Sequence, residues 1–317
     1  MNFTSDVKKE IISRGIGDGE DAQAEKRAGI SAFVRTSGTL GVNEGNPTFF
    51  LVSETENVAE FFTVLFFETL NTDLRITHAT MDKMSGRDKL LLQCPVQKCQ
   101  EVLKTLGLLK KTGGGIREGI SASLTATDGR KIAYIQGAFL GGGSCTIPGG
   151  DAKTGYHLEV VFSTRKTARD FCKILADFEL LAKLTVRKET FVVYIQNKEQ
   201  ISDFLAVIGV KNALRKFSEL VEKRDEANRV NRAQNCMAGN ADKAAKAAVK
   251  QVIAIGKLME KGFLDELGEE YKLLAKARLE HGEMSLQELA EYMGISKSCL
   301  NHRIRRIMAL AESFENT

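Results

Sequence analysis

Near its C-terminus the sequence concentrates side chains that can hydrogen-bond to nucleic acid. The set, within eleven residues, is Ser296, Lys297, Ser298, Asn301, His302, Arg303, Arg305 and Arg306. In the major groove an Asn amide can bond to adenine, and Arg or Lys can bond to guanine. Hydroxyls at a helix N-terminus suit phosphate oxygens. We predict base-edge contacts from Ser298, Asn301 and His302. We predict phosphate contacts from Lys297, Arg305 and Arg306.

Two helices joined by a tight turn are predicted to position this set. Ser285 and Glu288 have the spacing of a capping box, in which each side chain bonds to the backbone of the other residue. Gly294 favours a left-handed turn after the first helix, and Ser296 can cap a second helix over residues 297–311. Apolar residues recur at the spacing of an inward face, at Leu286, Leu289, Ala290, Met293, Leu300, Ile304 and Ile307. This pattern is typical of a helix-turn-helix, and a helix over residues 269–281 would complete a three-helix core.

A basic helical segment precedes this motif. Between residues 211 and 261, twelve Lys or Arg stand against six Asp or Glu. Residues 200–209, 212–227 and 241–258 have helical spacing, and the last of these is rich in Ala and Lys, which are strong helix formers. One interpretation is an exposed, solvated helix face. The other is a surface that follows a phosphate backbone, with contacts from Arg229, Arg232, Lys243, Lys246 and Lys250.

The first two thirds of the chain contain two similar blocks about 105 residues apart. Each begins with a helix of small and apolar residues, over 28–40 and again over 132–143. A strand-like run follows at 48–53 and 156–163, and then a second helical stretch at 58–70 and 168–181. More strand-like sequence closes each block, at 90–94 and 184–196. Internal duplication of a mixed α and β unit of about 100 residues accounts for this order.

The composition is that of an ordinary globular protein, with 43% hydrophobic and 27% charged residues and a net charge of +4. No apolar run approaches the length of a bilayer span, and the first residues lack a secretory signal. We therefore expect a cytoplasmic protein without a membrane partner. Six cysteines form no CxxC pair, and there are four histidines, so we predict no metal and no cofactor.

Ordered matches over about 300 residues give the sequence a more specific meaning. They are residues 5–12 (SDVKKEII), 33–40 (FVRTSGTL), 137–144 (GAFLGGGS), 156–162, 201–209 (ISDFLAVIG), 228–232 (NRVNR) and 296–306 (SKSCLNHRIRR). On these segments the sequence resembles the WhiA family, bacterial regulators of sporulation or cell division. The resemblance implies an α+β fold: tandem LAGLIDADG homing-endonuclease-like αββαββα units followed by an all-α helix-turn-helix domain. The implied divisions are an N-terminal helix at 1–21, LAGLIDADG-like units at 22–125 and 126–210, a basic helical connector at 211–262 and a helix-turn-helix domain at 263–317.

The resemblance also argues against catalysis. A LAGLIDADG nuclease holds divalent metals with an acidic residue at the base of each of two packed helices. Those positions fall on Ser37 and Gly142, which cannot supply carboxylates. The nearest acidic residues, Glu44 and Asp151, lie several residues further on. We therefore predict no enzyme activity, and we assign the small residues Ser37, Gly38, Gly142 and Gly143 to close packing of the two helices.

In the LAGLIDADG fold the two sheets form a concave saddle, which this sequence could use for DNA or for a protein partner. Basic side chains available to it are Arg75, His78, Lys83, Arg87, Lys89, Lys153, Arg165, Arg187 and Lys188. The leading hypothesis is a sequence-specific regulator that binds double-stranded DNA at promoters, associates with the nucleoid, and works with RNA polymerase or another regulator. The alternative is an interaction protein of the division machinery whose DNA binding is secondary.

Overall fold

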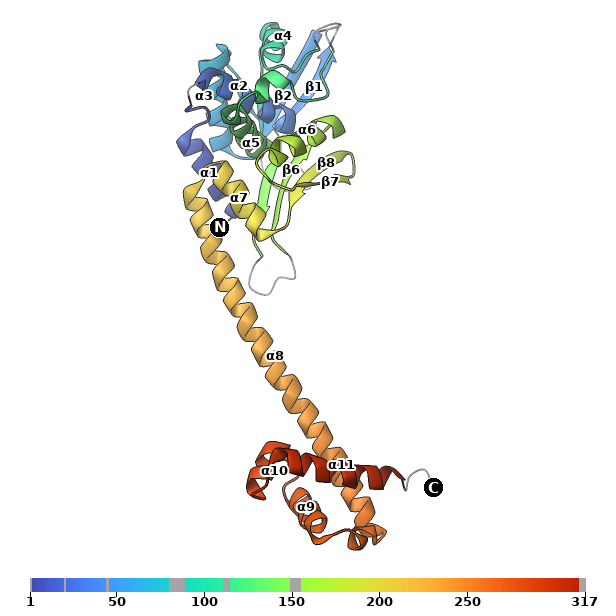
Figure 1. The fold of residues 1–317 in the computed structure, drawn as a ribbon. Helices are drawn as coiled ribbons and strands as arrows, with labels where there is room; N and C mark the ends of the chain where they lie inside the picture. Colours follow the sequence, from blue (N-terminus) through green and yellow to red (C-terminus); the bar gives the residue numbers. More distant parts are fainter. Residues whose placement is uncertain are drawn as a thin grey trace. The chain divides into compact units, whose positions relative to one another are not determined.

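The computed structural model describes residues 2–19, 21–43, 46–79, 89–110, 115–148 and 155–313. The chain separates into two compact units, Met1–Arg224 and Asp225–Thr317. Figure 1 follows the chain from the mixed helices and strands of the first unit to the helices of the second. No helix of the described ranges is both long and apolar enough to cross a membrane.

The first unit contains the same order of elements twice. After α1 (Phe3–Arg14), the first copy consists of α2 (Ala22–Ser37), β1 (Gly38–Asn43), β2 (Asn46–Ser53), α3 (Glu56–Leu70), β3 (Arg75–Ala79), β4 (Lys89–Gln93) and α4 (Val96–Thr105). A short 3-10 turn, η1 (Ala122–Thr125), precedes the second copy. This copy consists of α5 (Asp128–Gly142), β5 (Gly143–Thr146), β6 (His157–Phe162), α6 (Arg165–Ala176), β7 (Lys183–Arg187), β8 (Thr190–Ile195) and α7 (Lys198–Val207). The predicted tandem αββαββα fold is confirmed.

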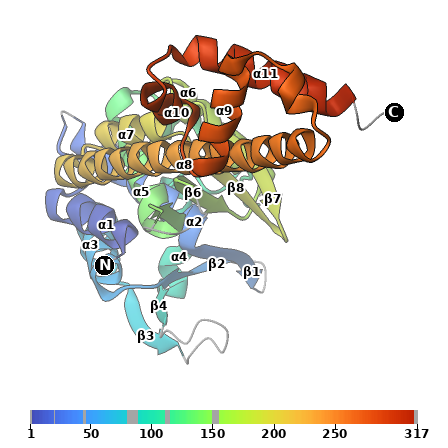
Figure 2. The ribbon, with the colours of Figure 1, turned by 90° about the horizontal axis from the view of Figure 1, so that it is seen from below.

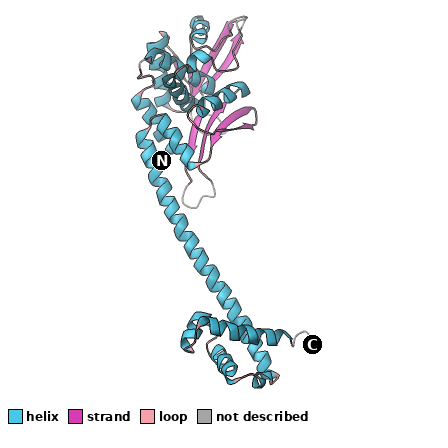
Figure 3. Ribbon diagram, in the orientation of Figure 1, coloured by secondary structure: helices cyan, strands magenta, loops and turns pink. Residues whose placement is uncertain are grey.

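Each copy forms a four-stranded antiparallel sheet, ordered β1-β2-β4-β3 in the first and β5-β6-β8-β7 in the second. Along β6 the side chains of Leu158, Val160 and Phe162 are buried, while those between them are half-buried. This alternation places one face of the sheet on the core and leaves the other to solvent. Figure 3 shows the helices of the first unit gathered on one side of its strands.

Helices α2 and α5 cross at two glycines. A Cβ atom on Gly137 would lie 2.0 Å from the backbone oxygen of Gly29, closer than any non-bonded contact allows. One on Gly29 would lie 2.8 Å from the Ile16 side chain. The close packing therefore runs from Gly29 and Gly137 to the helix ends that the sequence indicated, where a Cβ on Gly142 would lie 3.1 Å from the Thr36 Cβ atom. At Gly38 and Gly143 a Cβ would instead meet the residue's own helix, 2.2 Å from the Val34 carbonyl and 2.4 Å from the Phe139 ring.

The basic segment forms a single helix, α8 (Lys211–Glu260), which begins in the first unit and ends in the second. A basic helical connector was predicted over residues 211–262, with helical spacing at 212–227 and 241–258. The residues between these stretches include several Asn and Gly239, which have low helix propensity. No proline interrupts this stretch, and a helix already formed on both sides extends through such residues at modest cost. Figure 2 shows α8 as a continuous helix.

The second unit is built from the end of α8, a 3-10 turn η2 (Phe263–Glu266), α9 (Glu269–Glu280), α10 (Leu286–Tyr292) and α11 (Lys297–Ser313). Its core combines apolar residues of all four helices, among them Leu258, Leu274, Leu289, Leu300 and Ile304. Because Ala254, Ile255 and Leu258 of α8 belong to this core, the boundary expected at residue 262 falls inside the unit.

Arg278 holds the turn between α9 and α10. Its side chain is buried, with 1% exposure. Nε donates to the Gln251 amide oxygen at 2.9 Å, and Nη1 donates to the carbonyls of His281 and Met284. Burial lowers the pKa of Arg278, and the charge of Glu283 opposes that shift. The hydrogen bonds offset the cost of placing a guanidinium in a core.

Arg278→Ala is therefore expected to lower the free energy of unfolding of the second unit by about 2–3 kcal/mol, since buried acceptors lose their donor and a void remains. Urea unfolding followed by circular dichroism measures this change. Lys276→Ala, at an exposed position on the same helix, is the control and should stay within about 0.5 kcal/mol of wild type. An unchanged unfolding midpoint for Arg278→Ala would show that Arg278 does not stabilise the turn between α9 and α10.

Candidate nucleic-acid interface

The turn between α10 and α11 has the geometry that the sequence predicted. The Ser285 hydroxyl accepts the Glu288 backbone N–H at 3.3 Å, and the Glu288 carboxylate accepts the Ser285 N–H at 2.8 Å. The bond from Ser285 lowers the pKa of Glu288. Gly294 has φ +66°, a left-handed conformation that favours glycine, and the Ile295 N–H donates to the Ala290 carbonyl at 3.0 Å. The Ser296 hydroxyl then accepts the Cys299 N–H at 3.2 Å and caps α11.

Helix α11 has one buried and one exposed side. Leu300, Ile304 and Ile307 face the core and are at most 3% exposed. At about 100° per residue, the opposite side of the helix is occupied by Ser298, His302 and Arg305. All three are exposed, and Asn301 lies beside them, half-buried. Four predicted contact residues therefore share one outward strip at i, i+3, i+4 and i+7.

The remaining predicted residues of α11 divide into two groups. Ser296 and Lys297 are exposed at its N-terminal end. Arg303 and Arg306 instead contact α9: Arg303 Nη2 lies 2.6 Å from Glu270 Oε2, and the Arg306 guanidinium carbon lies 5.9 Å from the centre of the Tyr271 ring. Glu270 and Tyr271 were not predicted from the sequence. Nothing in their local pattern indicates a pairing with residues more than 30 positions away.

The five basic residues predicted on the connector share one face of α8. Arg229, Arg232, Lys243, Lys246 and Lys250 are all exposed. Helical geometry places them within about 100° of one another around the axis, over a length of about 32 Å. Two have partners on their own helix, since Arg229 pairs with Glu226 and Lys246 lies 2.7 Å from Asp242. Such exposed pairs are weak and exchange readily.

Among the residues that the structure describes, the basic residues proposed for the saddle do not all lie on one side of the sheets. Arg75 is exposed, and with Lys89 it takes positions on the solvent-facing side of the first sheet, paired with Gln93 and Ala79. His78 pairs instead with Leu90, whose side chain is buried. Arg165 belongs to helix α6, and Lys188 lies in the turn after β7 with φ +54°. Lys83, Arg87 and Lys153 lie outside the described residues.

Arg187 is engaged in an ion pair on the solvent-facing side of the second sheet. Its Nη1 and Nη2 bond to the two oxygens of Glu159 at 3.0 and 2.7 Å. His157 lies 2.8 Å from the same carboxylate. The Arg187 bond, with a smaller contribution from His157, lowers the pKa of Glu159. This bidentate pair leaves little net charge for a phosphate at that point.

At the two positions that correspond to nuclease carboxylates, Ser37 bonds within its own helix and Gly142 has no space for a longer side chain. The Ser37 hydroxyl donates to the Phe33 carbonyl at 2.7 Å. A Cβ on Gly142 would lie 2.9 Å from the Val161 carbonyl, so a longer side chain would require the backbone to move. Glu44 and Asp151 lie outside the described residues. Among the residues that the structure does describe, no group of three or more His, Cys, Asp or Glu could hold a metal ion.

Together, the duplicated αββαββα unit and the capped three-helix unit define a class of protein, in which a LAGLIDADG-like domain is joined to a helix-turn-helix domain. Family models agree: "WhiA LAGLIDADG-like domain" matches residues 131–227 and "WhiA C-terminal HTH domain" matches residues 230–311.

Whole-chain comparisons identify the family. The chain is 35% identical to "Probable cell division protein WhiA" of Staphylococcus epidermidis, over 100% of this chain and 98% of the relative. It is 34% identical to the protein of the same name from Staphylococcus haemolyticus, with the same coverage. The crystal structure of full-length WhiA from Thermatoga maritima shares the fold, with a TM-score of 0.57, 23% identity and 99% of both chains covered. The chain belongs to the WhiA family.

Proposed function

We propose that this protein is a sequence-specific DNA-binding transcription regulator that acts at promoters. The observation that carries the proposal is the outward strip of α11, where Ser298, Asn301, His302 and Arg305 lie opposite the buried side of a capped helix. A second helix of a helix-turn-helix enters the major groove with its N-terminal residues on base edges. In this assignment Asn301 and His302 contact bases, and Arg305 contacts a phosphate.

Helix α8 is proposed to add affinity without adding sequence selection. Its five exposed basic residues span about 32 Å, close to one turn of duplex DNA. Phosphate contacts of this kind dominate affinity and weaken as salt increases. Since one three-helix module buries little DNA, this second contact, or a partner such as RNA polymerase, would supply the rest of the binding free energy. Arg303 and Arg306 are proposed to orient α11 through α9.

No catalytic step is part of the proposal. Ser37 and Gly142 offer no carboxylate, and the backbone around Gly142 has no room for one. The proposed process is cell division with chromosome segregation, or sporulation, in the cytoplasm on the nucleoid. The name "cell division protein" carried by the relatives supports the first of these.

A second candidate is an interaction protein of the division machinery whose DNA binding is secondary. It is favoured by the solvent-facing side of the first unit, where Phe50 is 40% exposed and Arg187 is neutralised by Glu159. Such a surface suits a protein partner better than a phosphate backbone.

Fluorescence anisotropy with promoter fragments from the source genome, across a salt series, distinguishes the two candidates. The full chain would be compared with a chain that ends at Arg224, the last residue of the first unit. We expect the full chain to select particular fragments and the shortened chain to select none. Equal selection by both chains would place the reading in the first unit and reject α11 as the reading helix. No selection by either chain would reject the regulator in favour of the interaction protein.

A further inference from the structure

A cavity of about 410 Å³ lies in the first unit where its two copies meet the segment that links them. Its walls include Arg35 and residues 38–40 from the end of α2 and the start of β1. The linker contributes residues 116–118, and the start of α6 contributes Ser163, Thr164 and Thr167. This volume falls within the range typical of small-molecule sites.

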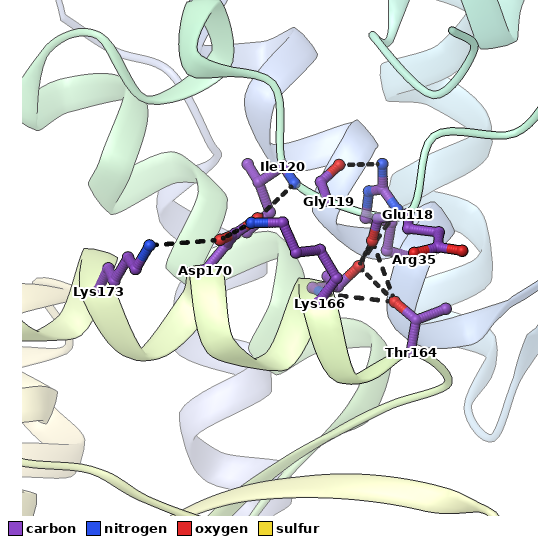
Figure 4. Close-up of polar contacts among 9 residues, drawn as sticks. Arg35, Glu118, Gly119, Ile120, Thr164, Lys166, Asp170 and Lys173 are labelled. Carbon is purple, nitrogen blue, oxygen red and sulfur yellow. Dashed lines mark hydrogen bonds and ion pairs between the residues drawn. The ribbon is translucent and has the colours of Figure 1, made fainter.

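The cavity wall is held in place by hydrogen bonds, which Figure 4 shows in close-up. Arg35 Nη2 donates to the Gly119 carbonyl at 2.6 Å, and Nη1 donates to the Thr167 hydroxyl at 3.3 Å. The Glu118 carbonyl accepts the hydroxyls of Thr164 and Thr167. The Asp170 carboxylate accepts the Ile120 N–H and pairs with Lys166. These bonds fix the linker against both helices before any ligand arrives.

Two arginines face this cavity without an anion. Arg35 is 6% exposed, and its Nε has no hydrogen-bond partner. Arg117 Nε is likewise buried without a partner. No ion pair joins either guanidinium to a carboxylate among the described residues, and the nearby Asp170 carboxylate is bonded to Lys166 and to the Ile120 N–H. Glu118 also lines the cavity, but its side chain is exposed. Burial lowers the pKa of Arg35, the neighbouring Arg117 charge adds to the shift, and Tyr134 and Asp170 oppose it.

Each guanidinium carries a buried Nε without a partner, and two buried positive charges side by side are costly, so an anion in the cavity would offset that charge. Guanidinium forks and hydroxyls together match the several oxygens of a phosphoryl group. A DNA duplex cannot reach a side chain as deeply buried as Arg35. We propose that this cavity binds a small phosphorylated molecule, up to the size of a mononucleotide, with its phosphate between Arg35 and Arg117 and near Thr39. The site is independent of the proposed DNA contact.

Isothermal titration of the full chain with inorganic phosphate, and then with adenosine monophosphate, tests this site, with chloride keeping the ionic strength constant. We expect binding that Arg117→Gln weakens at least about tenfold, since a hydrogen bond to a charged group is lost. Arg169→Gln removes the same charge from an exposed position on α6 and should bind as wild type does.

Thr39→Val is a second variant, at an exposed position that lines the cavity. It should weaken binding at least about threefold, and thermal melting without ligand checks that each variant is folded. No binding of either probe by the wild-type chain would overturn the proposal. Binding that survives both Arg117→Gln and Thr39→Val would also overturn it, because the anion would then lie elsewhere.

Discussion

Replacing His302 and Arg305 together with alanine is expected to lower the affinity for selected promoter fragments at least about 30-fold. Each base or phosphate contact of this kind contributes about 1–3 kcal/mol. Both side chains are exposed on α11, opposite its buried face, so the fold should not change. Fluorescence anisotropy against the selected fragments measures the loss, and thermal melting checks that the second unit is intact.

The single variants separate the two roles. Arg305→Ala should weaken all fragments about equally and reduce the slope of log affinity against log salt by about one. His302→Ala should instead reduce the preference among fragments and leave that slope unchanged. Lys276→Ala removes an exposed positive charge from α9, off the strip, and serves as the control. If the double variant kept its selection, α11 would not be the reading helix.

The parts of this interface that depend only on residues close in sequence were predictable from the sequence. The Ser285–Glu288 capping box and the left-handed Gly294 need no information from the rest of the chain, and both are present. The pairing of Arg303 with Glu270 is a contact across 33 positions, and the sequence placed Arg303 with the outward residues. Spacing along a helix fixes which side a residue takes, but not what packs against that side.

The difference between local patterns and contacts over long distances in sequence also explains which strands were predicted. Residues 48–53 and 156–163 alternate clearly, and both form strands. The strands β1 and β5 were not predicted, because GTLGVN and GSCT are short and rich in glycine. Each is stabilised by pairing with the next strand, as in Cys145 with Leu158. Their order became predictable only through the family resemblance.

The cavity at Arg35 shows the limit of reading a sequence for function. Arg35 and Arg117 are 82 positions apart, and the hydroxyls of Ser163 and Thr167 come from a third segment. No local motif joins them, because the fold alone brings the three segments together. Arg35 also lies within the segment 33–40 that matches the family, where its neighbours Ser37 and Gly38 suggested a role only in packing.

Gly137→Ala is expected to lower the free energy of unfolding of the first unit by about 4 kcal/mol or more. The added methyl carbon would lie 2.0 Å from the Gly29 carbonyl oxygen and 2.7 Å from its carbon. Neither is a flexible side chain, so α2 and α5 would have to separate along the contact that joins the two copies. Overpacking of a well-packed core usually costs about 1–3 kcal/mol, and a clash with backbone exceeds that range.

Chemical unfolding followed by circular dichroism measures the effect, with Gly256→Ala as the matched control. Gly256 lies in α8, where a Cβ would meet nothing within 4 Å. There the same substitution should stabilise its unit by up to about 1 kcal/mol, because alanine loses less conformational entropy in a helix. The two variants thus predict opposite signs for one chemical change. If Gly137→Ala unfolded at the wild-type midpoint, the two helices would not cross at Gly29 and Gly137, and the joint between the copies would have to lie elsewhere.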